Sequence, residues 1–288
     1  MSKEVKRVKV RILTPKKIGC CFGVMRAIQL TEDVLSKNKP VYIIGELVHN
    51  ETITRDLSEK GLRIVDDLGD VKSGTLIIRA HGLSPDERKR AQEKRLEIVD
   101  ATCPIVRQAQ NAAKRLEEEG YQVLIVGDKD HAEIKGIIGH LKSEAIVVAN
   151  HNEIKPTRLK RKIGLIFQTT HSIEFCKEVV AEVMKVAHEI KIINTICADI
   201  RRRQEDAVEI AKKVELMIVV GSHHSSNTIK LKKLCQKYNK NIIQIETAKD
   251  LTPAQIKKVK SIGIIGGAST PDILIEEAKR KLKNIYLK

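Results

Sequence analysis

The chain has 288 residues, of which 42% are hydrophobic and 31% are charged, and its formal net charge is +16. This composition predicts a soluble globular protein with a large core, and no apolar run is long enough to cross a membrane. The charged N-terminus is not followed by the apolar core of a signal peptide, so we expect a cytoplasmic protein.

Short runs rich in β-branched residues alternate with amphipathic helical patterns along most of the chain. Strands are predicted at Val8–Leu13, Val41–Ile44, Thr75–Arg79, Gln122–Val126, Gly164–Phe167, Glu189–Ile193, Leu216–Val220, Asn241–Ile245 and Ser261–Ile265. Helices are predicted at Val24–Ser36, Pro85–Lys94, Ile105–Glu119, Ile173–Ala187, Ile200–Lys213, Thr228–Tyr238 and Asp272–Leu282. This alternation is typical of parallel sheets covered by helices, so we expect an α/β protein.

Three cysteines, Cys21, Cys103 and Cys197, are separated by roughly a third of the chain, and each lies in a loop between an apolar run and a helical stretch. We therefore expect three similar α/β modules with mostly parallel sheets. Their bounds are predicted as residues 1–103, 104–194 and 195–270, with the C-terminal segment 271–288 packing back on the first module. Three thiolates at one centre would suit an iron–sulfur cluster in which one iron has no cysteine ligand.

The other cysteines have ordinary structural explanations. The six cysteines include no Cys-x-x-Cys pair, which argues against a zinc ribbon or a common ferredoxin loop. A disulfide framework is not expected in a cytosolic protein of this size. Cys176 and Cys235 fall within predicted helices, where we expect them to act as small apolar residues.

Polar residues follow the predicted strands, and ligands of open α/β sheets bind beyond the carboxyl ends of strands. The residues in these loops are His49, His81, His131, Glu133, Thr169, Ser225, Ser226, Asn227 and Ser269. Singly, a serine or asparagine before a helix is most often an N-cap, but Ser225, Ser226, Asn227 and Ser269 together predict a cradle for an anion. The chain has no nucleotide-binding glycine motif, so we expect a small phosphorylated or diphosphorylated ligand.

At these residues the chain resembles the hydroxymethylbutenyl diphosphate reductases, the LytB or IspH family, over nearly its whole length. The motifs that carry the resemblance are Gly19-x-Cys21-x-Gly23-Val24-x-Arg26-Ala27, Val48-His49-Asn50, Ala80-His81-Gly82, Asp100-Ala101-Thr102-Cys103-Pro104, His131-x-Glu133, Gln168-Thr169-Thr170, Ile196-Cys197, Arg203-Gln204, Ser225-Ser226-Asn227 and Gly267-Ala268-Ser269. One such motif would be weak support, whereas ten in order are highly specific.

The resemblance implies a [4Fe–4S] cluster held by Cys21, Cys103 and Cys197 at the centre of the three modules, in a pseudo-threefold arrangement. Its fourth iron would accept the hydroxyl of the substrate. The resemblance further implies that the substrate diphosphate is bound by His49, His81, His131, Ser225, Ser226, Asn227 and Ser269. Glu133 matches the acid that relays a proton, and Thr169 matches the threonine that works beside it and contacts the substrate.

The reaction implied is the removal of the allylic hydroxyl of 4-hydroxy-3-methylbut-2-enyl diphosphate with two electrons and two protons. It gives isopentenyl and dimethylallyl diphosphates in the last step of the non-mevalonate isoprenoid pathway. The chain has no flavin or nicotinamide motif of its own, so we expect an external electron donor. An acidic ferredoxin or flavodoxin would be attracted by the net charge of +16. We expect a monomer.

The chain departs from the family pattern at three places. Cys20 precedes the expected ligand, and Cys21 is chosen because Gly23 and Val24 follow it at the family spacing. Ala132 stands where a proline is common between His131 and Glu133. His223 and His224 stand before the serine–asparagine cradle, where the family more often has lysine or another polar residue.

Two alternatives come from other functional classes. A three-module cluster enzyme similar to quinolinate synthase would also use one cysteine per module, but it would catalyse no net reduction. A basic nucleic-acid-binding protein would show salt-dependent binding and no cluster chromophore. Aromatic residues make up only 2% of the chain and tryptophan is absent, so platforms for base stacking are scarce and we expect no nucleic-acid partner.

Overall fold

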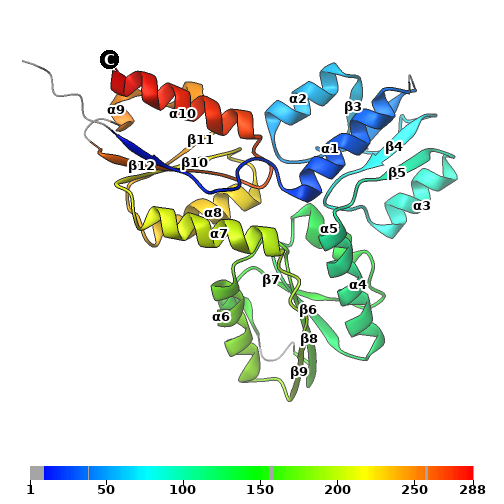
Figure 1. Ribbon diagram of the computed structural model, residues 1–288. Helices are drawn as coiled ribbons and strands as arrows, with labels where there is room; N and C mark the ends of the chain where they lie inside the picture. The colour runs from blue at the N-terminus through cyan, green and yellow to red at the C-terminus, as the bar shows by residue number, and fades with distance from the viewer. Residues whose placement is uncertain (1–9, 38, 156–158, 257–258, 288) are drawn as a thin grey trace, which may run out of the picture. The chain divides into compact units, whose positions relative to one another are not determined.

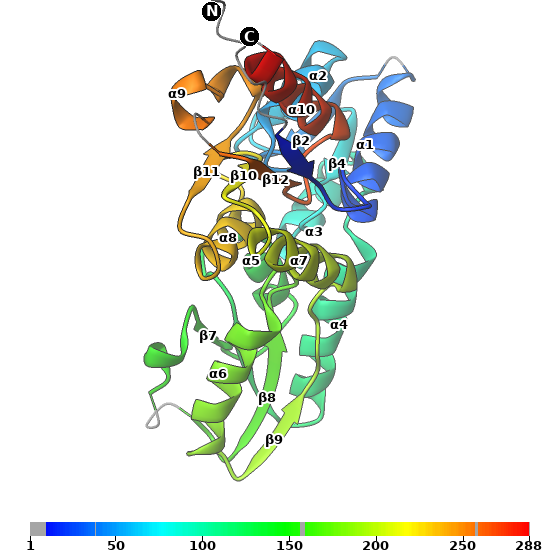
Figure 2. The same ribbon diagram turned by 60° about the vertical axis from the view of Figure 1, so that its left-hand side comes forward.

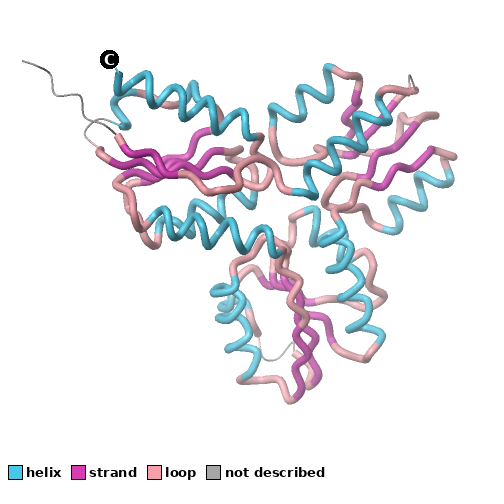
Figure 3. Tube along the Cα trace, viewed as in Figure 1, coloured by secondary structure: helices cyan, strands magenta, loops and turns pink. Residues whose placement is uncertain are grey.

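The computed structural model describes residues 10–37, 39–155, 159–256 and 259–287. The chain forms two compact units. The first comprises Met1–Cys21, His49–Glu51 and Arg202–Lys288, and the second comprises Phe22–Val48 and Thr52–Arg201. The strands form three four-stranded parallel sheets, and helices flank the strands of each sheet (Figure 3).

Sheet A lies in the first unit. Its strands, in spatial order, are β1 (Arg11–Leu13), β12 (Ser261–Gly266), β10 (Leu216–Val220) and β11 (Ile242–Ile245). Helix α10 (Asp272–Leu287) covers one face, while α7 (Ala198–Ala211) and α8 (Ser226–Gln236) cover the other (Figure 1). The short helix α9 (Pro253–Ile256) precedes β12. Every residue of β10 is buried, as expected for a parallel strand covered on both faces.

Sheets B and C lie in the second unit. Sheet B has the order β3 (Leu62–Val65), β2 (Val41–Ile44), β4 (Thr75–Ile78) and β5 (Glu97–Asp100). Sheet C has the order β7 (Ile146–Val148), β6 (Gln122–Val126), β8 (Lys162–Phe167) and β9 (Glu189–Ile192). Helices α1 (Phe22–Leu35) and α2 (Glu51–Glu59) flank sheet B on one side and α3 (Pro85–Glu93) flanks it on the other (Figure 1).

Alternate residues of β6 pack into the cores on the two faces of sheet C. Val123 and Ile125 pack beneath α4 (Pro104–Glu118) and α5 (Ala132–Ile138). Leu124 and Val126 pack against α6 (Ile173–Met184) on the opposite face. Since successive strand residues point to opposite faces, this short apolar strand fills two cores at once.

All the predicted strands and helices are present, with bounds that differ by a few residues. The predicted first strand begins at Val8, which lies outside the described residues, and the observed strand begins at Arg11. The elements that the sequence did not predict are β3, β5, β7, α2, α5 and α9. None of the described helices combines the length and the apolar character needed to span a membrane.

The first and last of the described elements, β1 and α10, pair with or pack on sheet A, whereas the sequence placed them with the first module. Strand β1, dark blue in Figure 2, pairs in parallel with β12. In this pairing Arg11 lies opposite Ser261. In α10, the apolar side chains of Leu274, Ile275, Ala278 and Leu282 pack into the core of sheet A. These spacings put them on one helical face, which must be buried against an apolar sheet. The module bounds near residues 103 and 194 stay a prediction.

Candidate active site

In every sheet the predicted cluster cysteine follows an edge strand. Cys21 follows β1, Cys103 follows β5 and Cys197 follows β9. These strands occupy the same position in the three sheet orders, at one end of each sheet. The three cysteines are therefore equivalent in topology, although their local sequences differ.

The other predicted site residues follow the two central strands of each sheet. The strand beside the cysteine strand is followed by Ser269 in sheet A, His81 in sheet B and Thr169 in sheet C. The next strand is followed by Ser225, Ser226 and Asn227 in sheet A, by His49 in the chain after β2 of sheet B, and by His131 and Glu133 in sheet C. The prediction that these residues lie beyond the carboxyl ends of parallel strands is confirmed.

The backbone N–H of each cysteine makes the same hydrogen bond. It donates to a carbonyl in the loop after the neighbouring strand: Cys21 to Ala268 at 2.8 Å, Cys103 to Ala80 at 3.0 Å and Cys197 to Thr169 at 2.9 Å. The cysteine loop of each sheet is therefore tied to a loop that carries a predicted substrate-binding residue. At the first cysteine it is Cys21, the residue chosen from the sequence, that occupies this position.

Each accepting carbonyl also sits at the same place in a four-residue turn. The N–H of the last residue donates to the carbonyl of the first, from Thr270 to Gly267, from Gly82 to Arg79 and from His171 to Gln168. The third residue of the turn is Ser269, His81 or Thr170. Thr170 thus occupies the position of two predicted substrate-binding residues. The sequence prediction passed over Thr170, although its place in Gln168-Thr169-Thr170 was the available signal.

A helix begins directly after each of the three cysteines. Helices α1, α4 and α7 start at Phe22, Pro104 and Ala198. Helix N-termini favour negative charge, and neither α1 nor α4 has an acidic residue in its first turn. Thiolates at these positions would supply the charge that such helix ends favour.

Cys103 shows how this environment acts on a thiol. It is the N-cap residue of α4. Burial raises the pKa of the Cys103 thiol, the N–H groups of Ile105 and Val106 act in the opposite direction, and negative charge at Cys197 and Glu133 adds to the rise. Cys103, Cys197 and Glu133 are therefore electrostatic neighbours within the second unit. Soft thiolates that receive backbone N–H bonds fit an iron–sulfur cluster.

The remaining cysteines are placed differently. Cys176 and Cys235 are buried in the cores beneath α6 and α8, which confirms their prediction as apolar helix residues. Burial raises the pKa of Cys235 to about 12. Burial also raises the pKa of Cys20 to about 12, with a contribution from Cys21, while the charge of Arg203 opposes the rise.

Glu133 and Thr169 form a two-point contact in the second unit. One carboxylate oxygen of Glu133 accepts the backbone N–H of Thr169 at 2.7 Å, and the other accepts its hydroxyl at 2.9 Å. Glu133 is 1% exposed and Thr169 is 5% exposed, so the pair is shielded from bulk water. His131 caps α5, and its Nδ1 accepts the N–H of Glu133 at 3.2 Å. Thr169 therefore orients the carboxyl group of Glu133, and His131 binds its backbone N–H.

His131 also meets a second predicted ligand of the substrate. The rings of His81 and His131 pack edge to face, with centroids 5.3 Å apart. These residues come from sheets B and C, so the second unit brings polar loops of two sheets together. Imidazole N–H groups are donors for phosphate oxygens, and protonation adds positive charge.

The first unit holds the predicted anion cradle. Ser225 is the N-cap of α8, and its hydroxyl accepts the N–H of Thr228 at 3.3 Å. The hydroxyl of Ser269 donates to the carbonyl of His49 at 3.3 Å, and the side-chain amide of Asn50 donates to the carbonyl of Ser269 at 2.9 Å. The hydroxyl of Ser225 thus serves as a cap, while Ser226 and Asn227 remain half-exposed.

The glycine before this cradle leaves no space for a side chain. A Cβ atom on Gly267 would lie 2.3 Å from the hydroxyl oxygen of Thr228, which is closer than atoms can approach. The backbone of the β12 loop therefore lies directly against the first turn of α8. This close approach brings Ser269 towards the N-terminus of that helix, where N–H groups favour an anion.

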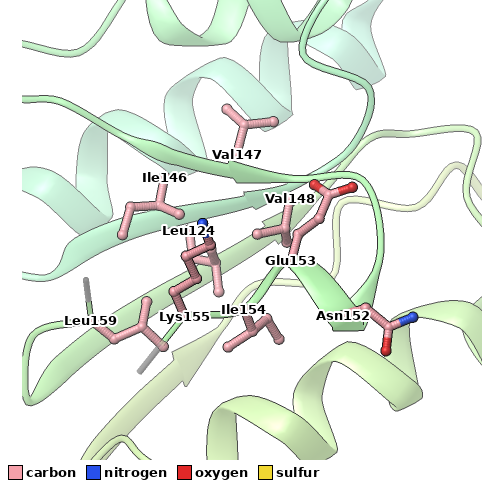
Figure 4. A pocket seen from close by; sticks show the side chains of 9 residues that line it. All are labelled: Leu124, Ile146, Val147, Val148, Asn152, Glu153, Ile154, Lys155 and Leu159. Atoms are coloured by element: carbon pink, nitrogen blue, oxygen red, sulfur yellow. The ribbon is translucent and has the colours of Figure 1, made fainter. Parts of the chain in front are cut away.

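A pocket of about 330 Å³ lies elsewhere in the second unit (Figure 4). It is lined by Leu124, Ile146, Val147, Val148, Asn152, Glu153, Ile154, Lys155 and Leu159. None of the residues predicted for the cluster, the substrate or catalysis lines it. The pocket belongs to the apolar face of sheet C beside α6 and not to the predicted site.

A family model described as LytB protein matches residues 12–283. The chain belongs to the LytB protein family. The 4-hydroxy-3-methylbut-2-enyl diphosphate reductase of Pelobacter propionicus is 40% identical over 279 residues, which cover 97% of this chain and 100% of the relative. A relative of the same name from Aquifex aeolicus is 38% identical and covers 96% and 97% of the two chains.

Solved structures of LytB relatives agree with the fold. A structure of (E)-4-hydroxy-3-methyl-but-2-enyl diphosphate reductase is 37% identical, with a TM-score of 0.71 over 96% of this chain and 99% of the other. The Plasmodium falciparum reductase is 30% identical, with a TM-score of 0.88 over 96% and 88%. The expected α/β architecture with three parallel-sheet modules is confirmed, and the chain is a reductase of the LytB family.

Proposed function

We propose that this chain is a 4-hydroxy-3-methylbut-2-enyl diphosphate reductase. The allylic C–O bond of the substrate is broken, two electrons from an external reductant enter the allyl group, and two protons are consumed. One proton leaves with the oxygen as water, and the other forms the new C–H bond of isopentenyl or dimethylallyl diphosphate. This is the last step of the non-mevalonate isoprenoid pathway.

The observation that carries this proposal is the threefold repetition of one arrangement. Each sheet supplies a cysteine after an edge strand, with its N–H bonded to the loop of the neighbouring strand. Polar side chains follow the two central strands in every sheet. A pattern kept in three modules of different local sequence suits one shared centre. It is the arrangement expected for three cluster ligands with substrate groups around them.

We assign Cys21, Cys103 and Cys197 as ligands of a [4Fe–4S] cluster whose fourth iron has no cysteine. When bound, the cluster supplies single electrons and a Lewis-acidic iron for the substrate oxygen. The protein contributes thiolates at helix N-termini and backbone N–H groups near sulfur, as seen at Cys103. These groups offset negative charge at the site.

Binding of the diphosphate is assigned to groups from all three modules. The residues assigned are His49, His81, His131, Ser225, Ser226, Asn227 and Ser269, and we add Thr170 because its turn position matches that of Ser269 and His81. The hydroxyl of Ser225 already caps α8, so its contribution is to order the helix N-terminus that faces an anion. Holding the diphosphate orients the allylic end of the substrate.

Glu133 is assigned as the source of the proton that leaves with water. Its buried carboxyl group is fixed at both oxygens by Thr169, so its orientation is set before substrate arrives. Thr169 also offers a hydroxyl through which a proton can pass to the substrate. General acid catalysis by a positioned carboxyl group contributes about 10²–10⁴-fold to a rate.

The electron donor is assigned as an acidic carrier protein of the ferredoxin or flavodoxin class. The chain carries a net charge of +16, which attracts such a partner and raises the encounter rate. We further propose that the protein acts as a monomer in the cytoplasm, without a nucleic-acid or membrane partner.

The direct test is an anaerobic turnover assay with the reconstituted protein, a reduced donor and the allylic diphosphate. Consumption of two electrons per product and release of both isomeric products are expected. Inorganic diphosphate should compete with the substrate, and Asn227→Ala should weaken that competition about tenfold or more through one lost hydrogen bond to a charged group. Cys103→Ser is the matched inactive control. Oxidation of the donor that does not depend on the allylic diphosphate would contradict the proposed reaction.

A further inference from the structure

Arg26 reaches across from α1 to the loop that holds Cys103. Its guanidinium donates to the carbonyl of Thr102 at 3.2 Å and to the carbonyl of Asp100 at 3.5 Å. Thr102 is the residue directly before Cys103, and it is only 5% exposed. Arg26 itself lies five residues after Cys21, at the start of the second turn of α1. One side chain thus connects the helix that begins after the first cysteine with the loop of the second.

The rest of this loop is closely hydrogen-bonded. The N–H of Ala101 donates to the carbonyl of Ile78, and the N–H of Thr102 donates to the carboxylate of Asp100. That carboxylate also contacts Arg88 and Arg107, each at 2.9 Å. With the N–H of Cys103 bonded to Ala80, the carbonyls of Asp100 and Thr102 are the groups that Arg26 satisfies. A buried carbonyl left without a donor would favour another loop conformation.

We propose that Arg26 is a positioning residue for the iron–sulfur cluster. It fixes the backbone of the Cys103 loop from the helix that begins after Cys21, so that the second ligand is held ready before the cluster is inserted. Arginine suits this role because its planar fork reaches two carbonyls, whereas the single ammonium of lysine cannot match both. This inference depends on the proposed function only in taking Cys103 as a cluster ligand.

The test compares Arg26→Gln and Arg26→Lys with Arg63→Gln. Arg63 is an exposed residue on β3 of sheet B, away from the Cys103 loop, and it contacts Tyr42 on the neighbouring strand β2. After anaerobic reconstitution, the half-time of cluster loss to an iron chelator is followed by visible absorption. The thermal unfolding of the cluster-free forms is measured alongside. We expect about tenfold faster loss for Arg26→Gln, a smaller effect for Arg26→Lys and no change for Arg63→Gln.

A positioning role and a purely structural role differ in the cluster-free protein. Positioning predicts near-native unfolding without the cluster, together with fast loss and an altered electron paramagnetic resonance signal once the cluster is bound. Native cluster lifetime and signal in Arg26→Gln would overturn the inference, as would a loss fully explained by unfolding of the cluster-free chain. Cys103→Ser tests the ligand assignment separately from the role of Arg26. If it retains a native cluster, the ligand assignment itself fails, whatever Arg26→Gln shows.

Discussion

The contact between Glu133 and Thr169 gives the sharpest prediction. Thr169→Val removes the hydroxyl that donates to Glu133 at 2.9 Å but keeps the shape of the side chain and the backbone N–H bond at 2.7 Å. Both residues are almost fully buried, so water does not replace the lost donor. Leaving a buried acceptor without its donor costs about 1–3 kcal/mol, and the free energy of unfolding should fall by about that amount.

The same bond orients the acid, so turnover should fall as well. If the lost free energy is expressed in the transition state, kcat falls about ten- to hundredfold. Glu133→Gln should cost more, about two to four orders of magnitude, because it removes the proton donor itself. Thr169→Ser keeps the hydroxyl and is the matched control, with turnover close to that of the native protein.

The assay is steady-state turnover under anaerobic conditions, with iron content and thermal unfolding measured on each preparation. Equal iron content across the variants makes the rates comparable. The reasoning is refuted if Thr169→Val turns over at the native rate while its stability falls, because the hydroxyl would then be structural. It is equally refuted if Thr169→Ser loses as much activity as Thr169→Val, because the shape of the side chain would then decide the rate.

Three further predictions concern the ligands, the Asp100 network and the donor. Cys20→Ser should retain native iron and sulfide content while Cys21→Ser loses the cluster, and the reverse result would shift the ligand by one residue. For Asp100, burial alone would raise the pKa, but hydrogen bonds from Thr102 and Arg88 and the charge of Arg107 outweigh it and lower the pKa. Because the pKa of Asp100 is lowered in the folded protein, the charged carboxylate stabilises the fold at pH values above the ordinary pKa of aspartate. This stabilisation is lost as the pH falls through the pKa of the folded state. Asp100→Asn should therefore lower the free energy of unfolding by about 1 kcal/mol at pH 7, and the difference from the native protein should shrink below about pH 4. Chemical denaturation at several pH values measures this difference, and a difference that does not change with pH would contradict the prediction. Turnover with an acidic protein donor should fall steeply between about 0.05 and 0.5 M salt, whereas turnover with a small neutral reductant should change little; equal salt dependences would mean that the basic surface does not guide the donor.

The sequence predicts the central strands and long helices because their signals are local. Strand β10 is a continuous apolar run, and α4 has a clear apolar face. The missed strands are short, and β3 and β5 each have at most one buried residue. Helix α5 has seven residues with Gly136 among them, which weakens a helical pattern. Tertiary packing, not propensity, stabilises these elements.

The candidate site was predictable for a related reason. Parallel strands all end at the same edge, so polar residues after apolar runs could be collected without knowing how the strands pair. The pairing itself is nonlocal, and nothing near Arg11 indicates that β1 lies beside β12. The same limitation concealed Thr170, since its equivalence to Ser269 and His81 depends on backbone turns in three separate sheets.

The pairing of β1 with β12 also sets an order of events during synthesis. The backbone N–H of Cys21 is bonded to the carbonyl of Ala268, so the first of the three predicted ligand cysteines to leave the ribosome is held by a loop made much later. At about 5–20 residues per second, the roughly 250 residues between them take about 12–50 s to translate. Sheets B and C come from uninterrupted stretches of chain and can form in that interval. Cys21 reaches its final place only after the loop that follows β12 has been made, so a cluster held by all three thiolates would be inserted after that point.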